Sequence, residues 1–323
     1  MQDRLALVFT GQGSQYVGMG LDLHAHYSEA RSVFDEADRA LGFDLSRLCF
    51  EGPEDDLNDT INTQPAVLTM SLAVLRAMGD VDGVGALCFV AGHSLGEYSA
   101  LAAAGKISLA DAIRLVRERG RLMKEAGERR PGGMAAVLGL PEETVAEACQ
   151  QARDETSATI QIANHNSPQQ IVISGETRGL ARAVELLKDK GARRVVPLAV
   201  SIASHSALME SAAQGLRDVL DTITLRESAI PVIGNVTARP LLHAEEIREE
   251  LVKQLVSPVR WVSSVRWMID QGVKTFVEIG PKDTLSKLIK RIDSDVRRIS
   301  VRDVTTVEGW RNAVHRRATT DGE

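Results

Sequence analysis

The sequence predicts an α/β protein whose largely parallel sheet is interrupted by a small inserted subdomain. Two observations lead to this prediction. Short apolar runs alternate with helical patterns over most of the chain, and the middle of the chain follows the order βαββαβ instead. At 323 residues the chain is long enough to bury a large core, as one elaborated domain or as two.

Five short runs rich in Val, Ile and Phe are the expected strands of the large sheet. They are residues 5–9, 87–91, 231–236, 275–279 and 298–301. Their nearly continuous apolar character is typical of parallel strands that are buried on both faces. Helical patterns lie between most of them, which favours an α/β core.

The middle of the chain is predicted to form a separate unit in the ferredoxin-like order. Its expected strands are residues 134–140, 159–163, 170–174 and 194–199, and its expected helices are residues 142–153 and 178–190. Both helices carry apolar residues at positions i, i+3, i+4 and i+7, starting at Val145 and Leu180.

This pattern sets the expected domain organisation. We place a ferredoxin-like subdomain at residues 129–198, inserted into a large α/β domain made of residues 1–128 and 199–323. The charged tail after Asp303 is expected to be loosely held.

Composition and charge exclude several classes of function. The chain has 38 basic and 44 acidic residues, and its formal charge of −6 provides no broad cationic face for nucleic acid or anionic lipid. Cys49, Cys88 and Cys149 lie far apart without C-x-x-C spacing, which argues against a disulfide framework and a zinc site. No secretory signal and no membrane-length apolar stretch is apparent. We expect a cytoplasmic protein without a bound metal.

The segment 92–96 is a G-x-S-x-G motif between an apolar run and an Ala-rich, helix-prone segment. In an α/β-hydrolase-like domain such a serine lies on a strained strand-to-helix turn with its Oγ exposed. The helix N-terminus favours a developing oxyanion, and the Leu95 N–H is a candidate donor. A chance match in a glycine-rich turn is the alternative, which the flanking strand and helix disfavour. The motif therefore predicts Ser94 as a nucleophile.

A serine nucleophile needs a base, and His205 is the preferred candidate. It follows the apolar run 195–200 and precedes a helix-like segment, so it is expected at a strand end, where open sheets place their sites. The residues alone leave the other histidines open: His24, His26, His93, His165, His243 and His315.

Arg119 is the candidate binding residue on a predicted helix that begins after Ser108. The apolar stripe of that helix contains Ala112, and a step of seven residues leads to Arg119, whose side chain is therefore expected to point inward. A buried guanidinium needs an anion, either a structural carboxylate or the carboxylate of a ligand. A ligand carboxylate would suit the fork of arginine, which can bind both oxygens.

The loop 10–15, TGQGSQ, is rich in glycine but does not fit a nucleotide-binding motif. G-x-G-x-x-G would require glycine where Tyr16 stands, and no Walker lysine follows. We expect instead that this loop brings a backbone N–H to the reacting centre as a second oxyanion donor. A plain tight turn after the first strand is the alternative.

Five motifs along the chain carry a family resemblance. They are GQGSQ at 11–15, GHSLGEYSA at 92–100, Arg119 in RERGRLM, ASHSALM at 203–209 and Gln254 in VKQLVSPVRW. Together they resemble the malonyl-CoA:acyl carrier protein transacylase family, which comprises acyltransferases of fatty acid and polyketide synthesis. The similarity runs from about residue 4 to about residue 301 in the same order and spacing.

The resemblance implies a ping-pong transfer through a serine ester. Ser94 would be the nucleophile, His205 its base and Arg119 the clamp for the free carboxylate of a malonyl group. The substrates would be a coenzyme A thioester and the phosphopantetheine thiol of an acyl carrier protein. No tightly bound cofactor and no nucleic acid or membrane partner are expected, and the chain is expected to be a monomer.

The resemblance also implies roles for groups around the nucleophile. The backbone N–H groups of Gln12 and Leu95 would form the oxyanion hole, and the main-chain carbonyl of Gln254 would orient the base in place of a triad aspartate. His93 and Asn164 are expected to bind substrate.

Several positions depart from the family pattern and leave the acyl specificity open. Thr10, His165, Gln169 and Asp283 replace residues that are common in the family, and His165 could line the acyl pocket. The small Ala203 near the base could leave room for a 2-substituted malonyl group. The alternatives to transfer are an editing hydrolase on the same fold, a carboxylesterase and a non-catalytic carrier-binding module.

An acidic carrier would need a local cationic surface on this net-negative protein. The preferred candidate is the small-subdomain cluster, Lys188, Lys190, Arg193 and Arg194. The competing candidate is the C-terminal cluster, Lys287, Lys290 and Arg291. Either could be an ordinary solvated surface.

Overall fold

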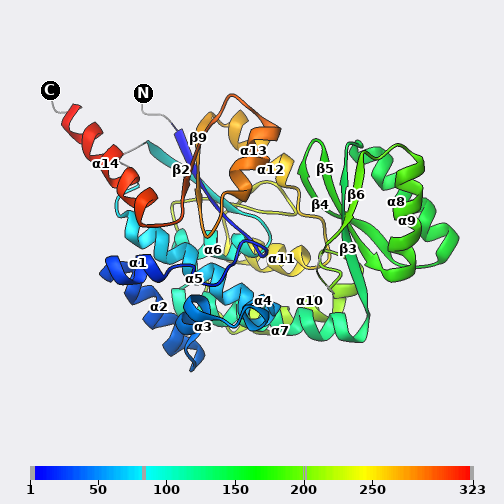
Figure 1. The fold of residues 1–323 in the computed structure, drawn as a ribbon, viewed down its shortest axis with the longest axis horizontal. Helices are drawn as coiled ribbons and strands as arrows, with labels where there is room; N and C mark the ends of the chain where they lie inside the picture. Colours follow the sequence, from blue (N-terminus) through cyan, green and yellow to red (C-terminus); the bar gives the residue numbers. More distant parts are fainter. Residues whose placement is uncertain (1–3, 82–84, 199, 201, 321–323) are drawn as a thin grey trace.

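A six-stranded sheet forms the centre of the larger part of the molecule (Figure 1). The computed structural model describes residues 4–81, 85–198, 200 and 202–320. The strand order is β10-β9-β1-β2-β7-β8, and every pair is parallel except β7 with β8. The bounds are β1 Arg4–Phe9, β2 Ala86–Gly92, β7 Val232–Ile233, β8 Pro240–Leu241, β9 Val273–Ile279 and β10 Arg297–Val301. The predicted α/β core is confirmed.

One predicted strand is much shorter than expected. The run 231–236 forms a strand only at Val232–Ile233, after which the chain turns. In this turn the Ala238 N–H donates to the Gly234 carbonyl at 3.1 Å, and Ala238 adopts a left-handed φ of 52°. The chain returns as β8, an antiparallel partner that the apolar pattern did not predict.

Helices cover both faces of the large sheet because alternate residues of its strands point to opposite sides. Leu5 and Leu7 of β1 join a core with α5, whereas Ala6 and Val8 join a core with α12 and α13. The bounds of the helices around this sheet are α1 Leu21–His26, α2 Ser28–Leu41, α3 Leu45–Glu51, α4 Glu54–Asn58, α5 Thr60–Met78, α6 Leu95–Ala103, α7 Leu109–Arg129, η1 Ala207–Met209, α10 Glu210–Asp221, α11 Ala244–Gln254, α12 Trp261–Asp270, α13 Thr284–Ile292 and α14 Val304–Thr320.

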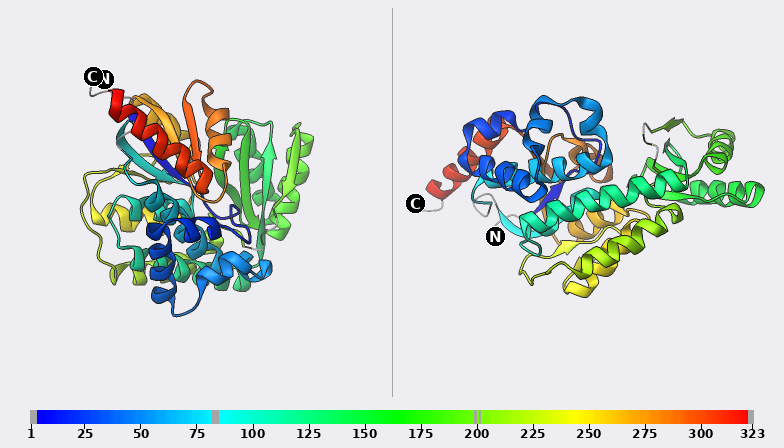
Figure 2. Two further views of the ribbon diagram at one scale, coloured as in Figure 1. Left: turned by 60° about the vertical axis from the view of Figure 1, so that its left-hand side comes forward. Right: turned by 90° about the horizontal axis from the view of Figure 1, so that it is seen from below.

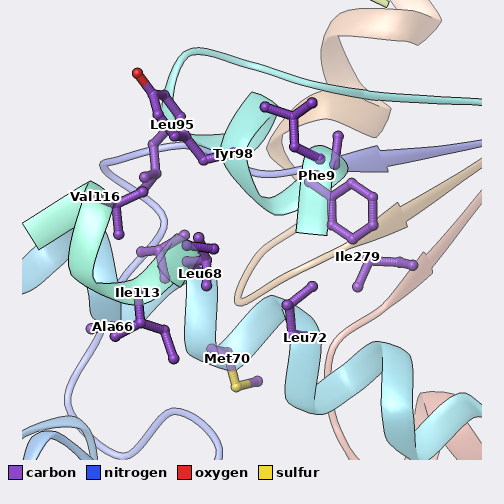
Figure 3. Close-up of a cluster of buried hydrophobic side chains, with 14 of the residues drawn as sticks. Phe9, Ala66, Leu68, Met70, Leu72, Leu95, Tyr98, Ile113, Val116 and Ile279 are labelled. Atoms are coloured by element: carbon purple, nitrogen blue, oxygen red, sulfur yellow. The ribbon is translucent and has the colours of Figure 1, made fainter. Parts of the chain in front are cut away.

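The central packing brings β1, α5, α6 and α7 together. Figure 3 shows Phe9, Leu72, Leu95 and Val116 within one buried cluster from these four elements. Burying each such side chain contributes about 1.5–3 kcal/mol. This packing fixes the helices that carry the proposed nucleophile and cation.

The C-terminal segment up to Thr320 is not loosely held, contrary to expectation. It forms α14, whose residues Val307 and Trp310 are buried in the main core. Trp310 Nε1 donates to the Asp80 carbonyl at 3.2 Å. Val307 and Trp310 are spaced i, i+3 and lie on one helical face, so the apolar pair anchors a segment whose charges suggested mobility.

A second, antiparallel sheet has the predicted ferredoxin-like arrangement (Figure 1). Its strand order is β4-β5-β3-β6, and α8 and α9 cover one face. The bounds are β3 Gly132–Leu138, α8 Glu142–Thr156, β4 Ile160–Ser167, β5 Gln170–Glu176, α9 Thr177–Asp189 and β6 Arg194–Pro197. Ala199, the expected last residue of the fourth strand, lies outside the described residues.

Strand β4 joins the small sheet to the segment that leads into α12 of the larger part. The His165 N–H donates to the Val259 carbonyl, and the Val259 N–H donates to the Ala163 carbonyl, both at 2.9 Å. The long helix α7 leads from the larger part to β3 (Figure 2).

All strands of the second sheet fall within residues 129–198, and we propose these limits for the small subdomain. Among the described helices, none has the length and apolar composition needed to cross a membrane.

Candidate active site

Ser94 lies on a sharp turn between β2 and α6. β2 ends at Gly92, α6 begins at Leu95, and Ser94 adopts a left-handed φ of 52°. A Cβ at Gly92 would lie 1.9 Å from the Gly96 carbonyl, and a Cβ at Gly96 would lie 2.1 Å from the Phe9 carbonyl oxygen. Only glycine permits these approaches. The strand-turn-helix context predicted for Ser94 is therefore present.

Asn235 holds this turn from the segment that follows β7. The Ser94 N–H donates to Asn235 Oδ1 at 2.7 Å, and Asn235 Nδ2 donates to the Gly92 carbonyl at 2.7 Å. The Ser94 N–H is thus engaged and is not free to bind an oxyanion. In the part of the chain that the structure describes, the backbone N–H groups of Gln12 and Leu95 have no acceptor. Both remain open to a ligand.

His205 lies beside Ser94 with both ring nitrogens engaged. Its Nε2 is 2.9 Å from Ser94 Oγ, and its Nδ1 is 2.7 Å from the Gln254 carbonyl oxygen. A carbonyl can only accept, so Nδ1 carries the hydrogen and the Nε2 lone pair faces the serine. Burial, followed by the positive charge of Arg119, lowers the pKa of His205 to about 3. The imidazole is therefore neutral, as a base must be.

Arg119 projects from α7 into the same site and is 1% exposed. Its Nη1 donates to Gln64 Oε1 at 2.7 Å, and its Nη2 donates to Gln254 Oε1 at 3.0 Å and to Ser94 Oγ at 3.2 Å. Across the described residues, no carboxylate forms an ion pair with Arg119. Every acceptor of this buried cation is a neutral group.

A chain of hydrogen bonds links the loop after β1 to Arg119. Thr60 Oγ1 donates to Gln12 Oε1 at 2.9 Å, and Gln64 Nε2 donates to Thr60 Oγ1 at 3.0 Å. Thr60 and Gln64 are one turn apart on α5, so both side chains lie on one face. The donor end of the Gln64 amide is thereby occupied, and its oxygen is directed to Arg119.

Glu97 lies behind the nucleophile and accepts a hydrogen bond from the Gln254 amide. Gln254 Nε2 is 2.5 Å from Glu97 Oε2 and 2.9 Å from the Ser94 carbonyl oxygen. Burial, aided by the nearby carboxyl of Glu250, raises the pKa of Glu97 well above its usual range. Glu97 bonds to the Gln254 amide and forms no ion pair with Arg119 among the described residues.

The structure separates the two expected substrate-binding residues. His93 adjoins Ser94, and its Nε2 lies 2.7 Å from Asn166 Oδ1; burial lowers the pKa of His93. Asn164 is buried in β4, and within the described chain its side chain makes no hydrogen bond to Ser94 or His205. Asn166, two residues along the strand, is the asparagine that contacts His93, the residue before Ser94.

His165 does not line the site, contrary to the expectation that it could. Its Nδ1 is 2.8 Å from Glu142 Oε2, at the start of α8 on the helix-covered side of the small sheet. A strand sends successive side chains to opposite faces, so His165 points away while Asn166 points inward. Ala203 is buried and packs beside Gly132.

A cavity of about 530 Å³ opens beside the loop after β1 that contains Gln12. Gln12, Thr60 and Ser204 line it, and Asp59 and Glu128 add acidic groups to its wall. The residues that line it do not include the small-subdomain cluster: Lys188, Lys190, Arg193 and Arg194. That cluster runs from the end of α9 to the start of β6, with Arg194 paired to Leu138 at the last residue of β3.

Known proteins share this fold and are similar in sequence over most of the chain. The family model described as "Acyl transferase domain" matches residues 6–312. The malonyl CoA-acyl carrier protein transacylase of Bacillus subtilis is 45% identical over 305 residues, which cover 94% of this chain and 95% of that protein. The chain belongs to the malonyl CoA-acyl carrier protein transacylase family.

Further comparisons agree with this family. The transacylase of Escherichia coli K12 is 45% identical over 289 residues, covering 90% of this chain and 93% of its own. A solved malonyl-transacylase in complex with a type II PKS acyl-carrier protein superimposes with a TM-score of 0.91 at 42% identity, covering 96% of this chain and 99% of that chain.

Sequence reasoning missed three side chains that shape the site of this transacylase. Gln64, Asn235 and Gln161 each direct a carboxamide at the groups around Ser94 and His205. The only signal for Asn235 was its place at the end of a short apolar run. Gln64 and Gln161 carry no motif that separates them from other polar residues of a helix or strand.

Proposed function

We propose that the enzyme transfers a malonyl group from coenzyme A to the phosphopantetheine thiol of an acyl carrier protein, through an ester on Ser94. The observation that carries this proposal is the buried Arg119, whose guanidinium has only neutral acceptors and lies 3.2 Å from Ser94 Oγ. A buried charge without a counter-ion is costly, and the free carboxylate of a bound malonyl group would supply one.

A free donor on Arg119 favours a carboxylate ligand. Its Nε is buried and has no hydrogen-bond partner among the described residues. Nε shares one edge of the planar guanidinium with Nη2, which donates to Gln254 Oε1 and to Ser94 Oγ. A carboxylate that took the place of Ser94 Oγ at Nη2 would bind both donors of this edge at once, while Gln64 continued to accept from Nη1.

In the acylation half-reaction, His205 Nε2 takes the proton of Ser94 Oγ as the oxygen attacks the thioester carbonyl carbon. The negative charge that develops on the carbonyl oxygen would be bound by the N–H groups of Gln12 and Leu95. The carbon–sulfur bond then breaks, and the coenzyme A thiolate recovers the proton from His205. The Gln254 carbonyl accepts from Nδ1–H throughout and stabilises the transient imidazolium.

The transfer half-reaction repeats these steps with the carrier thiol as nucleophile. His205 removes the thiol proton, the sulfur attacks the ester carbonyl, and the same N–H groups bind the oxyanion. When the ester bond breaks, Ser94 Oγ takes the proton back. All of these groups come from one chain, and we propose that the monomer is the active unit.

An editing hydrolase on this fold is the second candidate, with water as acceptor. We place transfer ahead of it because a hydrolase that clears neutral acyl groups would gain little from the buried charge of Arg119. Malonate release from the acylated enzyme should therefore be slow without a carrier.

Intact-mass measurement tests this function directly. Malonyl-CoA should add one malonyl mass to the wild type and to the control Ser32→Ala, on the exposed side of α2, and none to Ser94→Ala. When phosphopantetheinylated carrier is added, the enzyme should lose the malonyl mass and the carrier should gain it. Carrier that lacks the phosphopantetheine arm should leave the acylated enzyme unchanged. Malonate release as fast as transfer would identify a hydrolase, and persistent labelling of Ser94→Ala would exclude the proposed ester.

A panel of acyl-CoA thioesters tests the acyl specificity. We propose malonyl as the preferred group because relatives that are 45% identical to this chain are malonyl CoA-acyl carrier protein transacylases. Methylmalonyl-CoA should acylate Ser94 more slowly than malonyl-CoA in the same mass assay.

A further inference from the structure

The backbone of His205 is strained and needs support from outside its own segment. His205 has a φ of 58°, in the left-handed region where a residue with a Cβ costs about 1–3 kcal/mol. Such a conformation persists only when neighbouring groups fix it. The residue before it, Ser204, begins no regular element, and η1 starts only at Ala207.

The carboxamide of Gln161 provides this support. Its Nε2 donates to the His205 carbonyl at 3.1 Å and to the Val256 carbonyl at 3.2 Å. Its Oε1 accepts from the Ala207 N–H at 3.3 Å. One side chain therefore binds the carbonyl of the left-handed residue, the N–H two residues later and a second segment as well.

That second segment carries the group that orients the base. Val256 lies two residues after Gln254, whose carbonyl accepts from His205 Nδ1–H at 2.7 Å. Gln161 thus ties together the backbone that bears the imidazole and the backbone that bears its acceptor. Among the described residues, no other side chain hydrogen-bonds to both the His205 and the Val256 carbonyls.

Gln161 makes these bonds from β4, the strand of the small sheet that also pairs with Val259. We propose that Gln161 is a positioning residue, which holds the His205 imidazole in line between Ser94 Oγ and the Gln254 carbonyl without touching substrate. This inference rests on the proposed role of His205 as the base. Because His205 serves in both half-reactions, Gln161 would support acylation and transfer alike.

Replacing Gln161 by methionine removes all three bonds and keeps a side chain of similar length. The His205 backbone could then relax from its left-handed conformation, and the imidazole would leave its line to Ser94. A displacement of about 1 Å at a reacting group can cost on the order of 100-fold in rate. We expect the single-turnover acylation rate of Gln161→Met to fall about 10- to 100-fold, with KM for malonyl-CoA changed less than about twofold.

Quenched-flow intact-mass measurement of the full chain separates positioning from folding. Its amplitude counts the molecules that can be acylated, and its rate reports the geometry at Ser94. A reduced rate at full amplitude supports the proposal. A reduced amplitude with an unchanged rate means that Gln161 only stabilises the fold, and it overturns the proposal.

Two further variants make the comparison specific, and a third is held in reserve. Gln151→Met removes an exposed carboxamide on α8, which bonds only to Glu155, and should acylate like the wild type. Gln161→Glu keeps the acceptor for the Ala207 N–H but loses both donors, so its rate should fall as well. If Gln161→Met does not fold, Gln161→Asn, which keeps the carboxamide one methylene shorter, takes its place in the same assay.

An NMR signal provides a readout that a purely structural role would not change. The proton on His205 Nδ1, bonded to the Gln254 carbonyl, should give a downfield resonance in nitrogen-15 histidine-labelled enzyme. We expect this resonance to broaden or vanish in Gln161→Met and to persist in Gln151→Met. A retained resonance together with a wild-type acylation rate would overturn the inference.

The variant His205→Ala distinguishes failure of this inference from failure of the proposed function. If His205→Ala acylates as fast as the wild type, the assigned base is wrong and the proposed mechanism fails with it. If His205→Ala is slow while Gln161→Met remains fast at full amplitude, only the positioning role is rejected.

Discussion

Arg119 shows how a single residue can indicate a ligand group. Its guanidinium is buried against the amide oxygens of Gln64 and Gln254 and the hydroxyl of Ser94, and Glu97 bonds to the Gln254 amide instead of to Arg119. Among the described residues, this positive charge beside the nucleophile therefore has no ion-paired partner. The cost of that charge would be recovered when an anionic acyl group binds.

The first prediction concerns this charge. Arg119→Ala should lose more activity with malonyl-CoA than with acetyl-CoA, by about 2–4 kcal/mol of relative transition-state binding, because only malonyl carries the second carboxylate. The ratio of kcat/KM for the two thioesters measures the effect. Arg117→Ala is the matched control, since Arg117 lies on the same helix but bonds to Asn62 and stacks on Phe43. An equal loss for both thioesters would make Arg119 structural.

The second prediction concerns the pH dependence of acylation. A general base must be neutral, and an unperturbed imidazole would place the acid limb near pH 6.5. Burial and the charge of Arg119 lower the pKa of His205 to about 3, so protonation requires a much lower pH. We expect kcat/KM for acylation to change less than about twofold between pH 5 and pH 7. The acylation endpoint at each pH controls for unfolding. A fall of kcat/KM with an apparent pKa near 6.5 would contradict this prediction.

The residues that sequence could identify are those whose chemistry depends on local spacing. Ser94 follows from its own strand-turn-helix motif, and Arg119 from the period of one helix. Asn235 could not be identified, because it bonds to Ser94 across 141 positions of the chain. His165 was misplaced because the residues alone did not show which face of β4 each side chain occupies.

At the scale of elements, the sharp turn at Ser94 depends on close contact between β1, β2 and α6. Gly92 and Gly96 allow the first turn of α6 to approach the carbonyl of Phe9. Patterns along the chain predicted these elements well, since each is encoded by its own residues. The short β7 and the packed α14 were predicted poorly. The extent of β7 depends on its antiparallel partner β8, and the position of α14 depends on its packing against the main core.

The third prediction tests this contact. A methyl at position 96 would overlap the Phe9 carbonyl oxygen at 2.1 Å, so backbone must move. Gly96→Ala should lower the free energy of unfolding by about 1–3 kcal/mol, as overpacking does, and slow acylation of the molecules that remain folded. Denaturant unfolding and the acylation rate measure the two effects.

Gly309→Ala is the control for this change. Gly309 lies within α14 and has open space around it, so alanine there should leave acylation unchanged and add about 0.5–1 kcal/mol of stability. A wild-type acylation rate in Gly96→Ala would show that the sharp turn at Ser94 tolerates a wider approach of α6.

At the scale of the molecule, the active site is built across two sheets. Ser94 and Arg119 come from elements of the larger part, while Gln161 and Asn166 of β4 in the smaller part bond to His205 and His93 beside them. The order of elements along the chain predicted both sheets. It could not predict how they meet, because that junction depends on hydrogen bonds between side chain and backbone that leave no periodic signal.

The last prediction concerns where the carrier docks. We propose the small-subdomain cluster, Lys188, Lys190, Arg193 and Arg194, because an acidic carrier needs a local cationic surface on this net-negative chain. Lys190 is partly neutralised by Glu147 at 3.5 Å. At most about 20 Å of extended chain separates Arg194 from Val200 at the cavity, so a carrier there would depend on its extended phosphopantetheine arm.

Charge reversal distinguishes the two candidate surfaces. Reversing Lys190 and Arg194 to Glu should raise KM for the carrier severalfold and weaken its salt dependence, because screened attraction between opposite charges is lost. Formation of the malonyl ester from malonyl-CoA should stay normal, since that half-reaction does not involve the carrier. Reversing Lys290 and Arg291 on α13 is the matched comparison, at the surface where Arg291 bonds to Gln170. If only this second pair raises KM, the carrier docks beside α13, where the β4–β5 turn meets the larger part of the molecule.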